Sequence, residues 1–227
     1  MLYLLEIENF YCIRTAQTVD LRIGEGVGDE PGRFDTLFPG SKERASRVVA
    51  FFGPNASGKS TVLKALAFVA WFIKDSFQLV PDAGLPCERF NDADAQMQPI
   101  RLAIEASAAL DPTAETVDET TKFGTWRYEL SVQSIRGRYV VGSETLKQRA
   151  DGRGKWVRVF ERSGAEIKGG KVFGLAGYAN VNSITSLRCG YARLLSRSSP
   201  TSWLIATRSL IRMRSVTTPP TRHPWRH

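Results

Sequence analysis

The sequence predicts an α/β fold in which a strand, a glycine-rich turn and a helix precede an antiparallel β region. Three observations lead to this prediction. Residues 48–52 are a continuous apolar run, which is typical of a strand buried on both faces. Residues 59–75 contain no Gly or Pro and are dense in Ala, Leu, Phe and Trp, which favours a helix. From residue 100 onward the pattern changes to short strand-like segments.

The N-terminal part is expected to open with two strands. Residues 2–7 form a short apolar run, and residues 18–23 alternate apolar with polar side chains, as a half-buried strand does. Residues 24–47 are rich in Gly, Pro and charge and are interpreted as a loop. The helix 59–75 is apolar nearly all round, which predicts a helix enclosed inside a domain rather than one lying on a surface.

The antiparallel β region is predicted over about residues 100–162. Its four strand-like segments are residues 100–107, 126–133, 139–146 and 156–162, separated by turns rich in Gly, Asp and Thr. The longest connection, residues 108–125, is acidic and is expected to be a surface loop.

Charge is distributed unevenly along the 227 residues, although the formal net charge is +8. Residues 188–227 hold eight Arg and no acidic residue, whereas residues 1–187 hold 23 basic and 23 acidic residues. We therefore predict one domain over residues 1–187, followed by a tail rich in Arg, Ser and Pro. The abrupt change in composition suggests a tail read out of frame in a truncated gene; a genuine basic disordered tail is the alternative.

Composition favours a soluble, cytoplasmic protein. The hydrophobic share of 42% and charged share of 24% are those of an ordinary globular domain. Cys12, Cys87 and Cys189 lie too far apart for a CxxC motif and are an odd number for a disulfide framework. The start of the chain lacks the basic region of a signal peptide, and the longest apolar run, residues 65–73, is too short to span a bilayer.

A complete phosphate-binding motif lies between the predicted strand and helix. Gly53, Gly58, Lys59 and Ser60 meet the pattern G-x-x-x-x-G-K-[ST], which predicts a P-loop NTPase. The glycines let main-chain N–H groups point at phosphate oxygens, and the helix N-terminus favours the negative charge. The predicted ATP-binding residues are Gly53, Pro54, Asn55, Ala56, Ser57, Gly58, Lys59, Ser60 and Thr61.

Three of these residues have predicted individual roles. Lys59 is expected to contact the β- and γ-phosphates, and Ser60 to ligate Mg²⁺ through its hydroxyl. Thr61 is expected to be a further hydroxyl donor, to the α-phosphate. The predicted cofactors are therefore ATP and Mg²⁺.

Residues for hydrolysis are harder to find. A P-loop ATPase needs a Walker-B acid for Mg²⁺ and a group that positions water. The nearest candidate acid is Glu105, after Ile104, but Arg101 interrupts the apolar run before it. His223 and His227 both fall in the last five residues, so residues 1–187 cannot supply a catalytic or metal-binding histidine. The sequence therefore assigns no catalytic residue.

The motif and its flanks resemble the N-terminal lobe of ABC-class ATPase heads. The resemblance covers residues 1–187 and is carried by the opening residues 4–10, the loop 53–61 and the β segments after the helix. Within that group the chain looks most like bacterial AAA-labelled ATPases of abortive infection and phage defence, related to overcoming-lysogenization-defect proteins. The resemblance implies a cytoplasmic ATPase that works as a homodimer or with a second ATPase head, alongside a possible effector or nuclease.

The sequence lacks several motifs of that group, and this limits the ATP hydrolysis that we expect. Its second lobe supplies the signature sequence, Walker B, a catalytic acid and a switch histidine, and this chain shows none of them. Residues 195–199 begin like a signature but lack its glycines. Because such heads hydrolyse ATP between a loop and the opposite signature, we expect this chain alone to hydrolyse weakly or not at all.

Other functions stay open on the sequence. The chain could be a non-hydrolysing nucleotide-binding subunit that completes a head from another chain, or a DNA-associated ATPase of the chromosome-maintenance and repair type. Nucleic-acid binding through the Arg-rich tail is weakly supported, because its aromatic residues are too sparse for a stacking platform. A small-molecule kinase or a transporter head fits less well, since no acceptor-site or membrane-coupling feature is visible.

Overall fold

The structure, a computed structural model, describes eight stretches of the chain. They are residues 1–24, 26–28, 31–76, 79–80, 83–110, 119–150, 154–164 and 166–169. The predicted tail, residues 188–227, lies outside the described residues, and so do residues 111–118 of the predicted loop 108–125.

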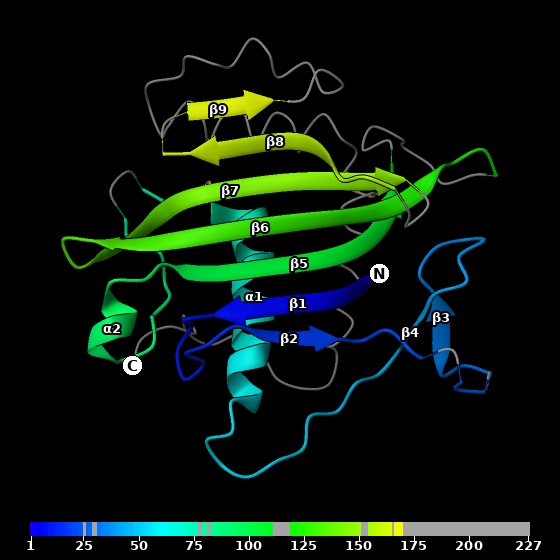
Figure 1. The fold of residues 1–227 in the computed structure, drawn as a ribbon, viewed down its shortest axis with the longest axis horizontal. Helices are drawn as coiled ribbons and strands as arrows, with labels where there is room; N and C mark the ends of the chain where they lie inside the picture. Colours follow the sequence, from blue (N-terminus) through cyan, green and yellow to red (C-terminus); the bar gives the residue numbers. More distant parts are fainter. Residues whose placement is uncertain are drawn as a thin grey trace.

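One large antiparallel sheet dominates the fold and is seen face on in Figure 1. Its seven strands lie in the order β2-β1-β5-β6-β7-β8-β9, and each neighbouring pair is antiparallel. Their bounds are Leu2–Glu8 for β1, Gln17–Asp20 for β2, Ile100–Ala109 for β5, Phe123–Ile135 for β6, Arg138–Ala150 for β7, Val157–Ser163 for β8 and Glu166–Gly169 for β9. The predicted antiparallel region corresponds to β5 to β8, of which β5, β6 and β7 are longer than predicted; β1 and β2 are added at one side and β9, which was not predicted, at the other.

A tight turn joins β6 to β7, whose pairing runs from Ile135 and Arg138 beside the turn to Gly124 and Ala150. Arg136 and Gly137 both have positive φ, 51° and 77°. Two consecutive residues of this kind form the hairpin turn whose twist matches that of the flanking strands.

Side-chain alternation gives the sheet an apolar face and a charged face. One apolar cross-strand row consists of Leu5, Ile104, Tyr128, Leu146 and Phe160. The neighbouring positions, which point the other way, include Glu6, Glu105, Arg127, Glu129 and Lys147. The main core of the described residues is built on the apolar face.

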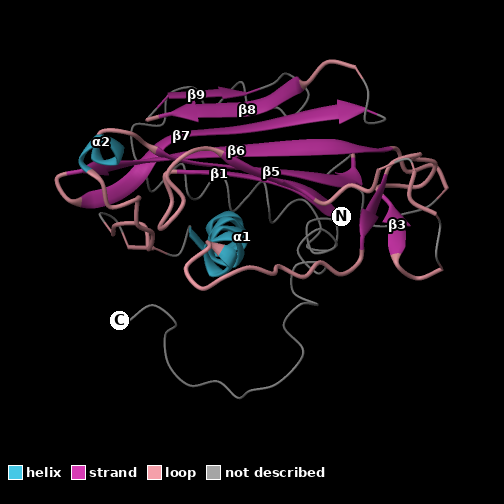
Figure 2. Ribbon diagram, turned by 60° about the horizontal axis from the view of Figure 1, so that its bottom comes forward, coloured by secondary structure: helices cyan, strands magenta, loops and turns pink. Residues whose placement is uncertain are grey.

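The helix α1, Lys59–Asp75, has the predicted bounds and lies on the apolar face, running across the strands (Figures 1 and 2). Its buried residues recur at helical spacing: Thr61, Ala65, Phe68, Val69 and Phe72. They join Leu5, Ile7, Leu102 and Leu130 in the main core. The expectation of a fully enclosed helix is not met in the described residues, where Leu63 on the outer side is 52% exposed.

The predicted loop 24–47 contains a small hairpin. Its strands, β3 Phe34–Thr36 and β4 Arg44–Ser46, form a separate two-stranded sheet. The predicted strand 18–23 ends early, at Asp20. Beyond that residue Arg22 pairs with Ala45 of the hairpin instead of with β1. Strands of three residues are too short to show alternation in the sequence.

The prediction of a buried strand at residues 48–52 is wrong in this structure. The segment forms no strand, and Val48 and Phe52 at its ends are 83% and 91% exposed. The physical reason is the lack of a neighbouring strand: within the described ranges no strand pairs with this segment, and only Val49 and Phe51 of its side chains are even partly buried. A short second helix, α2 Ala93–Gln96, was not predicted; the Asp92 side chain caps it by accepting from the amide of Asp94.

Candidate phosphate-binding site

The glycine-rich loop leads directly into α1, as the motif predicts. Residues 53–57 are exposed, and the chain enters the helix at Lys59. Three loop residues have positive φ: Gly53 at 152°, Ala56 at 64° and Gly58 at 90°. The loop therefore has a backbone conformation that residues other than glycine adopt only with strain.

The two glycines have backbone angles that favour glycine. The φ of Gly58, 90°, would strain a side chain there, although its Cβ would stay 3.8 Å from the nearest atoms, Cys12 Sγ and Ile13 Cγ1. The φ of Gly53, 152°, also disfavours a side chain, and a Cβ there would lie 3.0 Å from Ser57 Oγ, so the Ser57 side chain would have to shift slightly. Both positions therefore favour glycine.

The N-terminus of α1 has the features of an anion-binding site. No side chain caps its N-terminus, and its first turn carries no acidic residue. The amide groups of a first helical turn and the helix dipole both attract negative charge. The local geometry thus fits a phosphate group, as expected for the motif.

Lys59 folds back over the loop. Its Nζ donates to the carbonyl oxygens of Gly53 at 2.8 Å and Pro54 at 2.6 Å, and lies 3.3 Å from Ser57 Oγ. The ammonium is therefore held where the loop's own oxygens converge. An incoming phosphate offers it a stronger, charged partner for the same donors.

Ser60 and Thr61 differ in their surroundings. Ser60, the predicted Mg²⁺ ligand, is exposed beside the loop. Thr61 is only 6% exposed and begins the sheet-facing side of α1. Its Oγ1 lies 2.9 Å from the Sγ of Cys12, a residue of the turn that follows β1. Sequence reasoning missed this neighbour, since it lies 49 positions away and no local pattern marks it.

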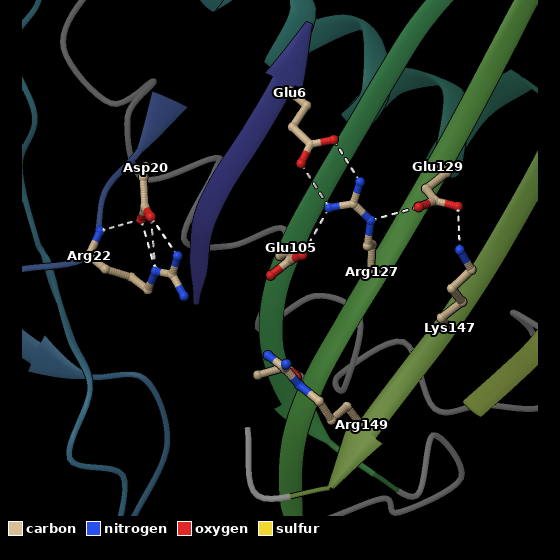
Figure 3. Close-up of polar contacts among 9 residues, drawn as sticks. Glu6, Asp20, Arg22, Glu105, Arg127, Glu129, Lys147 and Arg149 are labelled. Atoms are coloured by element: carbon tan, nitrogen blue, oxygen red, sulfur yellow. Dashed lines mark hydrogen bonds and ion pairs between the residues drawn. The ribbon is translucent and has the colours of Figure 1, made fainter. Parts of the chain in front are cut away.

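Glu105, the nearest candidate for a Walker-B acid, is used elsewhere. Figure 3 shows the Arg127 guanidinium among the carboxylates of Glu6, Glu105 and Glu129, at 2.6, 2.9 and 2.7 Å. Glu105 therefore belongs to the charged face of the sheet, opposite α1. Within the described residues, no three His, Cys, Asp or Glu side chains are grouped to hold a metal ion.

Comparison with known families decides the assignment. Residues 48–215, well over half of the chain, match the family described as "AAA domain, putative AbiEii toxin, Type IV TA system". The chain belongs to this family. As a member of this AAA-domain family it carries a P-loop ATPase-like domain, and the matched region includes the whole loop 53–61. The comparison with curated proteins gave no match.

In the part of the chain that the structure describes, no helix has the length and apolar character needed to cross a membrane. The signature-like residues 195–199 and both histidines lie outside the described residues.

Proposed function

We propose that this chain binds ATP with Mg²⁺ through the loop 53–61 and acts as an ABC-class ATPase head in phage defence by abortive infection. The observation that carries the proposal is the loop itself: a positive-φ curl closed by Lys59 at an uncapped helix N-terminus. The family description, which names a putative toxin of a toxin–antitoxin system, supports the defence context.

The chemistry of binding follows from the residues in place. When ATP binds, Lys59 exchanges the carbonyl oxygens of Gly53 and Pro54 for phosphate oxygens. The amides at the start of α1 donate to the same phosphates, and the exposed Ser60 hydroxyl supplies one ligand to Mg²⁺. These steps bind and orient the nucleotide; they do not activate a water molecule.

We expect turnover to need a second head. The carboxylate of Glu105 is already engaged by Arg127, and we expect a water-positioning group to come from another lobe or chain. The intact assembly would be a homodimer or a pair of heads, with an effector or nuclease as a further partner.

Parallel measurements of nucleotide binding and phosphate release test the proposal. The purified chain is expected to retain ATP in the presence of Mg²⁺ and to release phosphate no faster than Lys59→Ala. Lys59-dependent phosphate release by the chain alone would show that it contains its own catalytic acid, and the proposal of an incomplete head would then be wrong.

A second candidate function is favoured by the exposed apolar segment 48–52. This chain could be a non-hydrolysing subunit whose head is completed by another polypeptide, which would pair with the segment and cover Val48, Phe52 and Leu63. Co-expression with the product of a neighbouring reading frame that carries Walker B and signature motifs tests it. A one-to-one complex weakened by Phe52→Ser is expected; a chain that stays monomeric beside that product rules this candidate out.

A further inference from the structure

A turn outside the phosphate-binding motif packs against the first turn of α1. The turn comprises residues 9–13, directly after β1, and is closed by mutual hydrogen bonds between the main chains of Phe10 and Ile13, both 2.9 Å. It contacts α1 through the Cys12–Thr61 pair at 2.9 Å and through Lys64, whose Nζ lies 4.4 Å from the centre of the Tyr11 ring. Cys12 and Ile13 also border Gly58, the last loop residue before the helix.

This turn is firmly held by buried contacts. Asn9 is 2% exposed, and its side-chain amide donates to the carbonyl oxygens of Ala95 and Gln98 at 2.9 and 2.8 Å. Its Oδ1 accepts from the amide of Phe90 at 3.1 Å. The left-handed φ values of Asn9 and Tyr11, 52° and 48°, show a conformation that the surroundings must impose. A rigid support of this kind can set the position of whatever it touches.

Thr61 is where that support meets the nucleotide site. The residue is 6% exposed, and its hydroxyl lies 2.9 Å from Cys12 Sγ, so in this structure the hydroxyl is turned toward the 9–13 turn. Thr61 also follows Lys59 and Ser60 in the first turn of α1. In the proposed function, the main-chain amides of this turn bind the phosphates. A shift of Thr61 therefore changes the direction of the donors that bind the anion.

We propose that Cys12 is a positioning residue for ATP, acting through Thr61. The Cys12–Thr61 contact fixes the first turn of α1 so that its amides converge on the phosphates, and the Thr61 hydroxyl serves this contact rather than the α-phosphate. The inference rests on the proposed function, because it assumes that the loop binds ATP.

The test measures the Kd for ATP with Mg²⁺ in the full chain and four variants. They are Cys12→Ala, Cys12→Ser, Thr61→Val and the double variant Cys12→Ala/Thr61→Val. Thr18→Ala, an exposed substitution in β2, is the matched control. Lys59→Ala reports separately on whether binding uses the loop at all.

Cys12→Ala and Thr61→Val are each expected to weaken ATP binding by about three- to tenfold, the effect of losing one hydrogen bond. The double variant should bind no more weakly than the single ones, because both remove the same contact. Cys12→Ser should restore binding to within about twofold, since a hydroxyl replaces the thiol as donor or acceptor. A role confined to stability would lower the Tm of the free protein in these variants without changing the Kd well below that temperature.

Two results would overturn the inference while leaving the proposed function intact. One is Lys59-dependent ATP binding that Cys12→Ala leaves unchanged. The other is a further loss on adding Thr61→Val to Cys12→Ala, which would mean that the hydroxyl contacts phosphate directly. If Lys59→Ala bound ATP as tightly as the wild-type chain, both the proposed function and this inference would be wrong.

Discussion

At the residue scale, Ala56 holds a conformation that its side chain disfavours. Its φ of 64° is left-handed, which costs an L-residue roughly 1–2 kcal/mol. Ala56→Gly removes that strain but gives the unfolded chain more freedom, which offsets part of the gain. We expect Ala56→Gly to raise the free energy of unfolding by about 0.5 kcal/mol in urea titrations.

The same substitution at an alanine of α1 is the control, because there it should change the free energy of unfolding in the opposite direction. Ala67 is exposed on the helix, where glycine is unfavourable by about 1 kcal/mol. Ala67→Gly should therefore lower the free energy of unfolding while Ala56→Gly raises it. Destabilisation by both substitutions would contradict the left-handed conformation at Ala56.

Two cysteines of the described structure should differ sharply in reactivity. Cys12 is exposed, whereas burial raises the pKa of the Cys87 thiol to about 12, with a smaller contribution from Glu88. Alkylation requires the thiolate, so at pH 8 Cys87 should react with iodoacetamide at least about a hundredfold more slowly than Cys12. Mass spectrometry of a Cys189→Ser background measures both rates, and similar rates in the native protein would show that Cys87 is accessible. In denaturant both thiols should react alike.

At the scale of elements, the charged face of the sheet ties four strands together. Arg127 of β6 bonds to Glu6 of β1 and Glu105 of β5, while Glu129 joins it to Lys147 of β7 (Figure 3). Burial alone raises the pKa of Glu129, but hydrogen bonds from Arg127 and Lys147 outweigh it, and the pKa lies below its usual value. The network thus stabilises the charged carboxylates and, through them, the sheet.

Arg127→Met should destabilise the fold by about 2 kcal/mol at pH 7, because it leaves partly buried carboxylates without their partner. A carboxyl whose pKa is lower in the folded state stabilises the fold above its unfolded pKa and loses that contribution as the pH falls through the folded pKa. The difference between wild type and Arg127→Met should therefore shrink below about pH 4. Urea titrations at pH 7 and pH 3.5 measure it, and an unchanged difference would argue that Arg127 acts through packing alone.

At the scale of the whole molecule, the sequence predicted best where a pattern is local. The bounds of α1 followed from composition and the motif, and the strands after residue 100 from alternation. Pairing was less predictable: β1 joins β5 across the first hundred residues, and the 3-residue strands β3 and β4 leave no alternation to detect. The segment 48–52 was mispredicted because its pattern describes an environment that the described residues do not provide.

The candidate site divides in the same way. The loop residues could be named from the motif, because their roles are carried by type and spacing. The hydrogen bonds from Lys59 to the carbonyl oxygens of Gly53 and Pro54 depend on side-chain geometry. The contact between Cys12 and Thr61 joins segments that are distant in the sequence. Neither has a local signal in the sequence.

An equilibrium titration of the full chain with ATP, with and without Mg²⁺, tests the central claim most directly. Wild type, Lys59→Ala and the control Lys74→Ala are compared; Lys74 is exposed in the last turn of α1, at the far end of the helix from the loop. The account predicts saturable, Mg²⁺-enhanced binding that is lost in Lys59→Ala and changed far less in Lys74→Ala. Equal binding by wild type and Lys59→Ala, or none by wild type, would contradict it.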